Sequence, residues 1–140
     1  MEHLAILSKN RRILDKILSG EKTIESRWYK FRKTPYKNIS KGDTIYFKES
    51  GCPVTAKAKV AGTIFFDNLD KSKIKQILGT YGKQIGIDSH HASEYSEKNF
   101  CTLILIEDVR KIEPFEINKK GYGLMAAWIT LPDITSIKRR

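Results

Sequence analysis

The sequence has few cysteines and no long apolar run. Its two cysteines, Cys52 and Cys101, are too few for a disulfide scaffold. No apolar stretch approaches the roughly twenty residues that a membrane-spanning helix needs. Residues 1–12 contain too short an apolar segment for a secretory signal peptide. We therefore expect a soluble protein of the reducing cytoplasm that does not insert into a membrane.

Patterns that bind metals or cofactors are also scarce. His90 and His91 are adjacent and His3 is distant, so the histidines and the isolated cysteines lack the spacing of zinc ligands. The glycines at 121–123 lack the spacing and the following helix of a nucleotide-binding loop. The sequence predicts no metal and no cofactor.

Acidic residues are outnumbered, mainly in the first part of the chain. The protein carries 26 Lys and Arg against 16 Asp and Glu, which gives a formal net charge of +10. Residues 1–60 hold fourteen of the basic residues and six of the acidic ones, and residues 27–41 contain no acidic residue. Clustered positive charge of this kind is typical of proteins that bind nucleic acids.

Aromatic residues interleave with this basic stretch, and we name residues 28–37 the basic-aromatic arm. Cations pair with phosphates and aromatic rings stack on bases. The arm therefore predicts contacts to nucleic acid through Trp28, Tyr29, Lys30, Arg32 and Lys33. One alternative is a solvated surface whose aromatic side chains fill the core. Acidic proteins and anionic membranes are alternative partners.

The hydrophobic spacing predicts a single α+β domain over residues 1–140. Helical spacing over residues 8–18 ends before Gly20, and a second short helix over residues 70–78 ends at Gly79. A third helix over residues 88–99 is a weaker prediction. Strands are expected at 23–31, 43–49, 55–66, 101–106, 109–115 and 126–131. Without regular βαβ alternation, these elements predict a small, curved, mainly antiparallel β-barrel with two or three flanking helices.

The segment Gly20-x-Lys22-x-x-Glu25-x-Arg27 follows the end of the first predicted helix. Glu25 and Arg27 are two residues apart and share one face of a strand. Lys22 lies at the bend and can fold over that face, so the three charged residues form a compact triad. The alternative is an ion-pair network that only stabilises the bend between the helix and the strand. Surface ion pairs of this kind contribute about 0–1 kcal/mol to stability.

These four residues resemble the hallmark motif of the ASCH domain family, a branch of the PUA-like β-barrels. The likeness continues through residues 42–43, 121–123 and 127–128, so it covers nearly the whole chain. The resemblance implies a PUA-like fold with a cleft beside the barrel that binds RNA or nucleotides. It also implies which residues lie at this cleft, namely Lys22, Glu25 and Arg27, with Lys48, Glu49 and Ser50 nearby.

Some small bacterial relatives in this family look like amidohydrolases that act on a modified cytidine through the motif lysine and a threonine. Here Glu25 stands at the position of that threonine, so the nucleophile of those relatives carries over poorly. An enzyme of this kind would use Glu25 to activate water and Lys22 to stabilise the oxyanion. However, a general base must take up a proton, and the neighbouring cations Lys22 and Arg27 are expected to favour the charged carboxylate form of Glu25. This expectation favours binding over catalysis.

The sequence thus predicts an RNA- or nucleotide-binding domain. Glu25 would accept a hydrogen bond from an exocyclic amine, and Lys22 and Arg27 would hold phosphate. The stacking candidates are Trp28, Tyr122 and Trp128, of which Trp128 lies in an apolar run that is more typical of a core. The alternatives are a hydrolase of a modified nucleoside or of RNA, with Lys22 and Glu25 as catalytic residues, and a module that docks on another protein.

Overall fold

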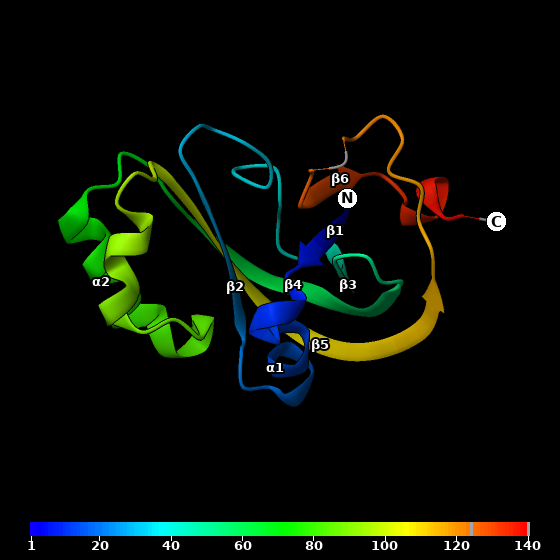
Figure 1. Ribbon diagram of the computed structural model, residues 1–140, viewed down its shortest axis with the longest axis horizontal. Helices are drawn as coiled ribbons and strands as arrows, with labels where there is room; N and C mark the ends of the chain where they lie inside the picture. The colour runs from blue at the N-terminus through cyan, green and yellow to red at the C-terminus, as the bar shows by residue number, and fades with distance from the viewer. Residues whose placement is uncertain (124, 140) are drawn as a thin grey trace.

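The computed structural model describes residues 1–123 and 125–139, and its six strands form one curled sheet (Figure 1). The strands are β1 (Glu2–Leu7), β2 (Ile24–Tyr29), β3 (Thr44–Glu49), β4 (Val54–Phe66), β5 (Phe100–Phe115) and β6 (Trp128–Leu131). Their order in the sheet is β2-β5-β4-β3-β1-β6. β1 and β3 are parallel and the other neighbours are antiparallel. The predicted mainly antiparallel, curved sheet is confirmed, as an open half-barrel.

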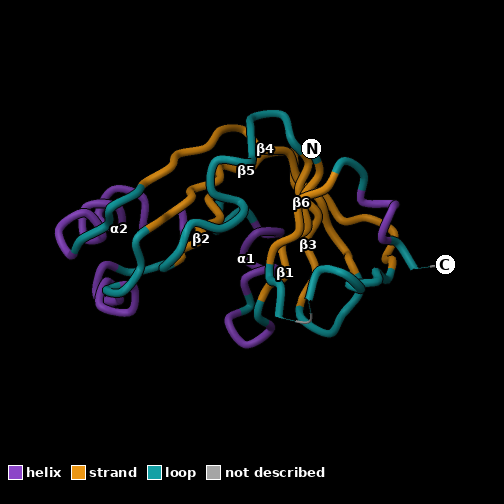
Figure 2. Tube along the Cα trace, turned by 90° about the horizontal axis from the view of Figure 1, so that it is seen from above, coloured by secondary structure: helices purple, strands orange, loops and turns teal. Residues whose placement is uncertain are grey.

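Two α-helices and three 3-10 helices flank the sheet. They are α1 (Ile13–Ser19), α2 (Lys71–Ile85), η1 (Lys9–Arg11), η2 (Ser89–Tyr95) and η3 (Ile134–Ile137). Figure 2 shows α2 at one end of the sheet and the C-terminus near the other. Among the described residues, no helix is both long enough and apolar enough to cross a membrane.

The first predicted helix is split in the structure. Residues 9–11 form η1, and Arg12 then adopts a left-handed conformation, with a φ of 53°, before α1 begins. Gly20 ends α1 in the left-handed region with a φ of 83°, a conformation that glycine adopts at little cost. The predicted end of this helix at Gly20 is confirmed.

The prediction that the second helix ends at Gly79 is wrong, because α2 continues to Ile85 and is capped by Gly86. Burial of Ile74, Ile77 and Ile85 against the sheet outweighs the low helix propensity of its glycines. Gly82 is required by close packing, since a Cβ atom there would lie 2.5 Å from the carbonyl oxygen of Ile87.

Two strand predictions also needed correction. β1 was not predicted, yet it lies between β3 and β6, where His3, Leu4 and Ala5 are fully buried. A short strand that is buried on both faces shows little alternation in the sequence. Residues 101–106 and 109–115 belong to one strand, β5, which accommodates its bend through a change of register near Asp108.

The packing of β2 determines where its polar side chains point. Ile24 and Trp28 lie in a core cluster with Ile74 and Ile77 of α2. Because side chains alternate along a strand, Glu25 and its neighbours two residues away face away from α2. A separate cluster around Phe47 fills the half-barrel under α1. The polar face of β2 therefore lies at the open side of the half-barrel.

Candidate ligand-binding cleft

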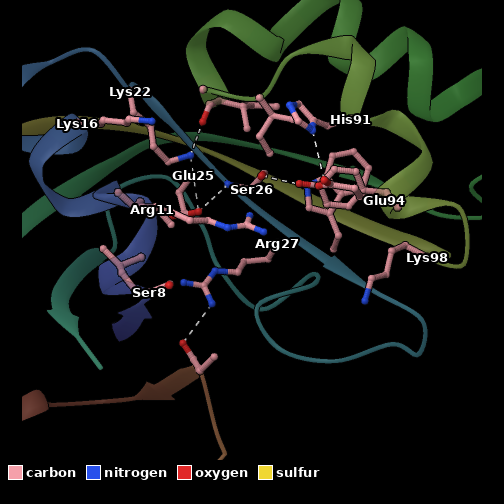
Figure 3. A pocket seen from close by; sticks show the side chains of 18 of the residues that line it. Ser8, Arg11, Lys16, Lys22, Glu25, Ser26, Arg27, His91, Glu94 and Lys98 are labelled. Carbon is pink, nitrogen blue, oxygen red and sulfur yellow. Dashed lines mark hydrogen bonds and ion pairs between the residues drawn. The ribbon is translucent and has the colours of Figure 1, made fainter. Parts of the chain in front are cut away.

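A cleft of about 700 Å³ runs along β2. Its walls come from β2, the end of β1, the segment that contains η1 and α1, the end of α2, and η2. Lys16 and Lys22 lie at one end of the cleft in Figure 3 and Lys98 lies at the other.

Lys22 is held at the closed end of the cleft. Its backbone N–H donates to the carbonyl of Lys16, and the N–H of Thr23 donates to the carbonyl of Gln84, both at 3.0 Å. The first bond holds the turn against α1, and the second joins it to the end of α2. The side chain is 6% exposed, and its Nζ donates to the carbonyl oxygen of Ile85 at 2.5 Å. Burial lowers the pKa of Lys22, the nearby Glu25 charge opposes this, and the Arg27 charge adds to it.

Glu25 is the buried acid of the cleft, and it is 4% exposed. Its Oε1 accepts a hydrogen bond of 3.0 Å from the N–H of Ser26 and lies 3.8 Å from Lys22 Nζ. Its Oε2 is buried and has no hydrogen-bond partner among the described residues. A buried acceptor that stays unpaired costs about 1–3 kcal/mol. This oxygen can accept a further hydrogen bond from a donor that enters the cleft.

Arg27 spans the open side of the half-barrel. Its Nη1 donates to the carbonyl of Ala127 at 3.2 Å, and its Nη2 donates to the carbonyl of Ile6 at 3.4 Å. Its guanidinium carbon lies 5.1 Å from the ring centroid of Trp128. The structure thus places all three motif residues in the wall of one cleft, with Lys22 paired to Glu25 and Arg27 bound to backbone carbonyls.

The structure changes which aromatic residues are available for stacking. Trp28 lines the cleft but is buried, and Tyr95 stacks on its ring at 4.4 Å between centroids. Trp128 is buried in the core and does not line the cleft, in keeping with its apolar run. Tyr122 is exposed in a loop outside the cleft. Tyr29 and Tyr95, both half-buried, are the tyrosines that line the cleft.

The exposed part of the basic-aromatic arm begins where the cleft ends. Lys30, Arg32 and Lys33 are exposed after the last residue of β2. Lys33 Nζ lies 5.3 Å from the ring centroid of Tyr29, which itself lines the cleft. Phe31 is 74% exposed, so its ring is open to a partner. The arm extends the positive charge of the cleft onto the surface.

The residues at the end of β3 do not line this cleft, contrary to expectation. Lys48 is buried and lines a second hollow, Glu49 is half-buried, and Ser50 is exposed. In the sheet order, β5 and β4 lie between β2 and β3, so the end of β3 is not a neighbour of β2. The order of strands in a sheet does not follow from local spacing, so these three residues were predicted too close to the motif.

Four further charged residues line the cleft that no sequence motif indicated. Arg11, Lys16 and Lys98 are cations in its wall, and Glu94 joins Glu25 as an acid. With Lys22 and Arg27, five Lys and Arg side chains face two carboxylates. The charge run at 9–16 was a usable signal for Arg11 and Lys16. No local pattern indicated that η2 and Lys98 pack beside β2.

Comparisons with known proteins identify the fold. No family model and no curated protein matches the sequence. The crystal structure of an ASCH protein from Zymomonas mobilis matches with a TM-score of 0.70 and 17% identity over 99% of this chain and 96% of that one. A variant of it matches with a TM-score of 0.71 and 18% identity over 96% and 91%. A protein described only as hypothetical matches with a TM-score of 0.51 and 22% identity over 80% and 100%. The chain therefore has the α+β fold of these ASCH structures, as its motif residues led us to expect.

Proposed function

We propose that this protein binds RNA or a nucleotide in the cleft along β2. The observation that carries the proposal is the buried Oε2 of Glu25, an acceptor without a partner among the described residues, in a cleft with an excess of cations. A nucleotide matches both features: its base carries N–H donors for the Glu25 oxygen, and its phosphate carries negative charge for the cations. The fold shared with ASCH structures supports the same interpretation.

In this proposal Glu25 selects the base. Its Oε1 is already occupied by the N–H of Ser26 and the charge of Lys22, which leaves Oε2 for a ligand donor. Exocyclic amines of cytosine, adenine and guanine are such donors, whereas uracil presents a carbonyl oxygen at the equivalent position of cytosine. We expect the cleft to prefer bases with an amine.

The cations of the cleft and of the arm hold the phosphates. Arg11, Lys16 and Lys98 lie along the cleft, and Lys30, Arg32 and Lys33 continue beyond its end. A single strand laid along β2 would place successive phosphates next to these side chains. Tyr29 and the exposed Phe31 offer rings for stacking.

Binding is favoured over hydrolysis by the contacts of the two residues that would be catalytic. Lys22 Nζ donates to the carbonyl of Ile85, so one of its protons is committed to the protein. Lys22 Nζ also lies 3.8 Å from Glu25 Oε1, so the two residues that would be catalytic pair with each other. Hydrolysis of a modified nucleoside or of RNA by Lys22 and Glu25 is the competing hypothesis.

The test is a titration of labelled single-stranded RNA, duplex RNA and mononucleotides, followed by fluorescence anisotropy or calorimetry at several salt concentrations. We expect saturable binding that weakens with salt and is tighter for cytidine and adenosine nucleotides than for uridine nucleotides. The double variant Arg11→Gln/Lys98→Gln should bind at least tenfold more weakly.

The matched control is Lys71→Gln/Lys75→Gln, which removes the same charge from the exposed surface of α2. It should leave binding within about twofold, because nonspecific charge effects are screened by salt. If no RNA or nucleotide binds the wild-type protein at low salt, the proposal is wrong. If both double variants weaken binding equally, the ligand does not occupy this cleft.

A further inference from the structure

A second hollow, of about 510 Å³, is lined by the end of β3, the loop after β5 and the C-terminal segment. Four of its lining residues are cations, namely Lys48, Lys119, Lys120 and Arg139, and none of the described residues that line it is acidic. An adjoining hollow of about 400 Å³ shares Lys120 and Arg139 and adds Lys138. Positive charge is thus concentrated in one concave place outside the cleft.

Lys48 is the most unusual of these cations. It is 8% exposed, and no hydrogen bond or ion pair links its ammonium group to any described residue. Lys22, buried to a similar degree, has both Ile85 and Glu25 as partners. Buried charges in proteins are normally paired with protein groups, whereas the Lys48 side chain opens onto the hollow that it lines. The environment of Lys48 therefore favours an anion beside it.

Lys119 reinforces this argument from the other wall of the hollow. Its Nζ donates to the carbonyl of Ala126 at 2.9 Å. Burial lowers the pKa of Lys119, and the charge of Lys48 lowers it further. The two ammonium groups are therefore close enough to repel each other. An anion between them would replace this repulsion with two attractive interactions.

The backbone around the hollow is held by hydrogen bonds before any ligand arrives. Asn118 N–H donates to the carbonyl of Ile137 at 2.8 Å, and Arg139 N–H donates to the carbonyl of Glu116 at 2.7 Å. The side chain of Asn118 accepts from the N–H of Lys120 at 2.9 Å. The loop and the C-terminal segment thus support each other, which reduces the entropy lost on binding.

Strand geometry separates this hollow from the cleft. Phe47 points into the half-barrel, whereas Tyr46 packs with Phe115 on the other face of the sheet. Lys48 follows Phe47 and therefore lies on the Tyr46 face. The lining residues of the hollow and of the cleft do not overlap.

We infer that this hollow is a second anion site, which binds a phosphate group through Lys48, Lys119, Lys120 and Arg139 independently of the cleft. Four cations without a lining acid suit a group that carries at least two negative charges, such as a phosphate monoester or inorganic phosphate. The guanidinium of Arg139 matches two phosphate oxygens, and the lysines supply point charges. A carboxylate, with one charge, would be bound more weakly.

The test is an NMR titration of the ¹⁵N-labelled full chain with inorganic phosphate, pyrophosphate and acetate at constant ionic strength. Phosphate should shift the amide signals of residues 118–123 and 138–139 in a saturable manner, pyrophosphate should bind more tightly, and acetate should not saturate. Lys48→Met and Lys120→Gln/Arg139→Gln should each weaken phosphate binding at least tenfold. Because Lys120 and Arg139 are exposed, the double variant tests the site even if Lys48→Met fails to fold.

Lys71→Gln/Lys75→Gln on α2 is the charge-matched control and should bind phosphate as the wild type does. The inference is overturned if phosphate causes no saturable shift, or if the control weakens binding as much as Lys120→Gln/Arg139→Gln does. A parallel titration with adenosine and adenosine monophosphate shows whether a phosphate ester is accepted as well as free phosphate. Arg11→Gln/Lys98→Gln should leave the phosphate-induced shifts unchanged. The phosphate site in the hollow and the nucleotide site in the cleft are therefore tested independently.

Discussion

Arg27 Nη1 donates a hydrogen bond of 3.2 Å to the carbonyl oxygen of Ala127, and this contact links β2 to the segment that leads into β6. β2 and β6 lie at opposite ends of the sheet order. A second bond from the same guanidinium reaches Ile6 in β1. One side chain of the motif therefore connects the two edges of the half-barrel and also lines the cleft.

Replacement of Arg27 should destabilise the protein. Arg27→Ala removes two charge-assisted hydrogen bonds and the contact with the Trp128 ring, so we expect a loss of about 1–3 kcal/mol in the free energy of unfolding. Arg27→Lys cannot reproduce the planar fork and should recover only part of this loss. Urea unfolding followed by circular dichroism measures both variants. A loss below about 0.5 kcal/mol for Arg27→Ala, the range of ordinary surface substitutions, would show that the guanidinium does not join the sheet edges.

Glu25→Gln distinguishes binding from hydrolysis. The amide keeps the shape of the side chain but replaces one carboxylate oxygen by a donor. Nucleotide binding should largely survive, with a loss of no more than about tenfold for one hydrogen bond, and the preference for amine-bearing bases should shrink. A hydrolytic activity that needs a carboxylate base would instead fall by about 10²–10⁴-fold. Calorimetry and product analysis on the same samples separate the outcomes, with Glu94→Gln in the same cleft as the control.

The basic-aromatic arm should contribute phosphate contacts to RNA binding. In Lys30→Ala/Arg32→Ala/Lys33→Ala, the slope of log K against log salt for single-stranded RNA should decrease by about 2, because each phosphate contact contributes about 0.7. Lys71→Ala/Lys75→Ala/Lys111→Ala removes three other exposed cations and should leave the slope unchanged. An unchanged slope in the arm variant would mean that the arm is only a solvated surface.

Stability should fall as the pH falls because of His3. His3 is fully buried, its Nδ1 lies 2.9 Å from Thr130 Oγ1, and its Nε2 lies 2.8 Å from Asp43 Oδ2. Burial lowers the pKa of His3, although the hydrogen bond and charge of Asp43 oppose this and the N-terminal ammonium group adds to it. The unfolded chain therefore takes up a proton near pH 6.5 while the folded protein resists it.

The stabilisation due to neutral His3 is therefore complete above pH 6.5 and is lost as the pH falls from 6.5 through the lowered pKa of the folded state. Urea unfolding across this range should show a slope in the wild type that is reduced in His3→Gln. His90→Gln/His91→Gln changes two exposed histidines and should keep the wild-type slope. Equal slopes in all three proteins would contradict the role of His3.

The motif was predictable from the sequence because its geometry is local. Gly20 ends a helix through its own backbone conformation, and the alternation of β2 places Glu25 on the face opposite Ile24. Lys22 is three residues from Glu25, close enough for the chain to bring them to 3.8 Å. The excess of positive charge that follows β2 is visible in residues 27–41, which contain no acidic residue.

The rest of the cleft depends on which distant segments pack together. Lys98 reaches the cleft because η2 packs beside β2, whereas Lys48 lies outside it because β5 and β4 separate β3 from β2. Tyr95, which is far away in the sequence, stacks on the ring of Trp28 in the wall of the cleft. The spacing of side chains along the sequence does not predict such contacts between distant segments.

The sequence by itself determined the class of the fold, the end of the first helix and the three charged residues of the motif, because these depend on backbone preferences and on periods of two to four residues. The tertiary structure decided that Arg27 joins the sheet edges, that Glu25 keeps one oxygen unpaired among the described residues, and that Lys48 belongs to a separate basic hollow. These features arise from strand order and from burial, which are properties of contacts between residues distant in the chain.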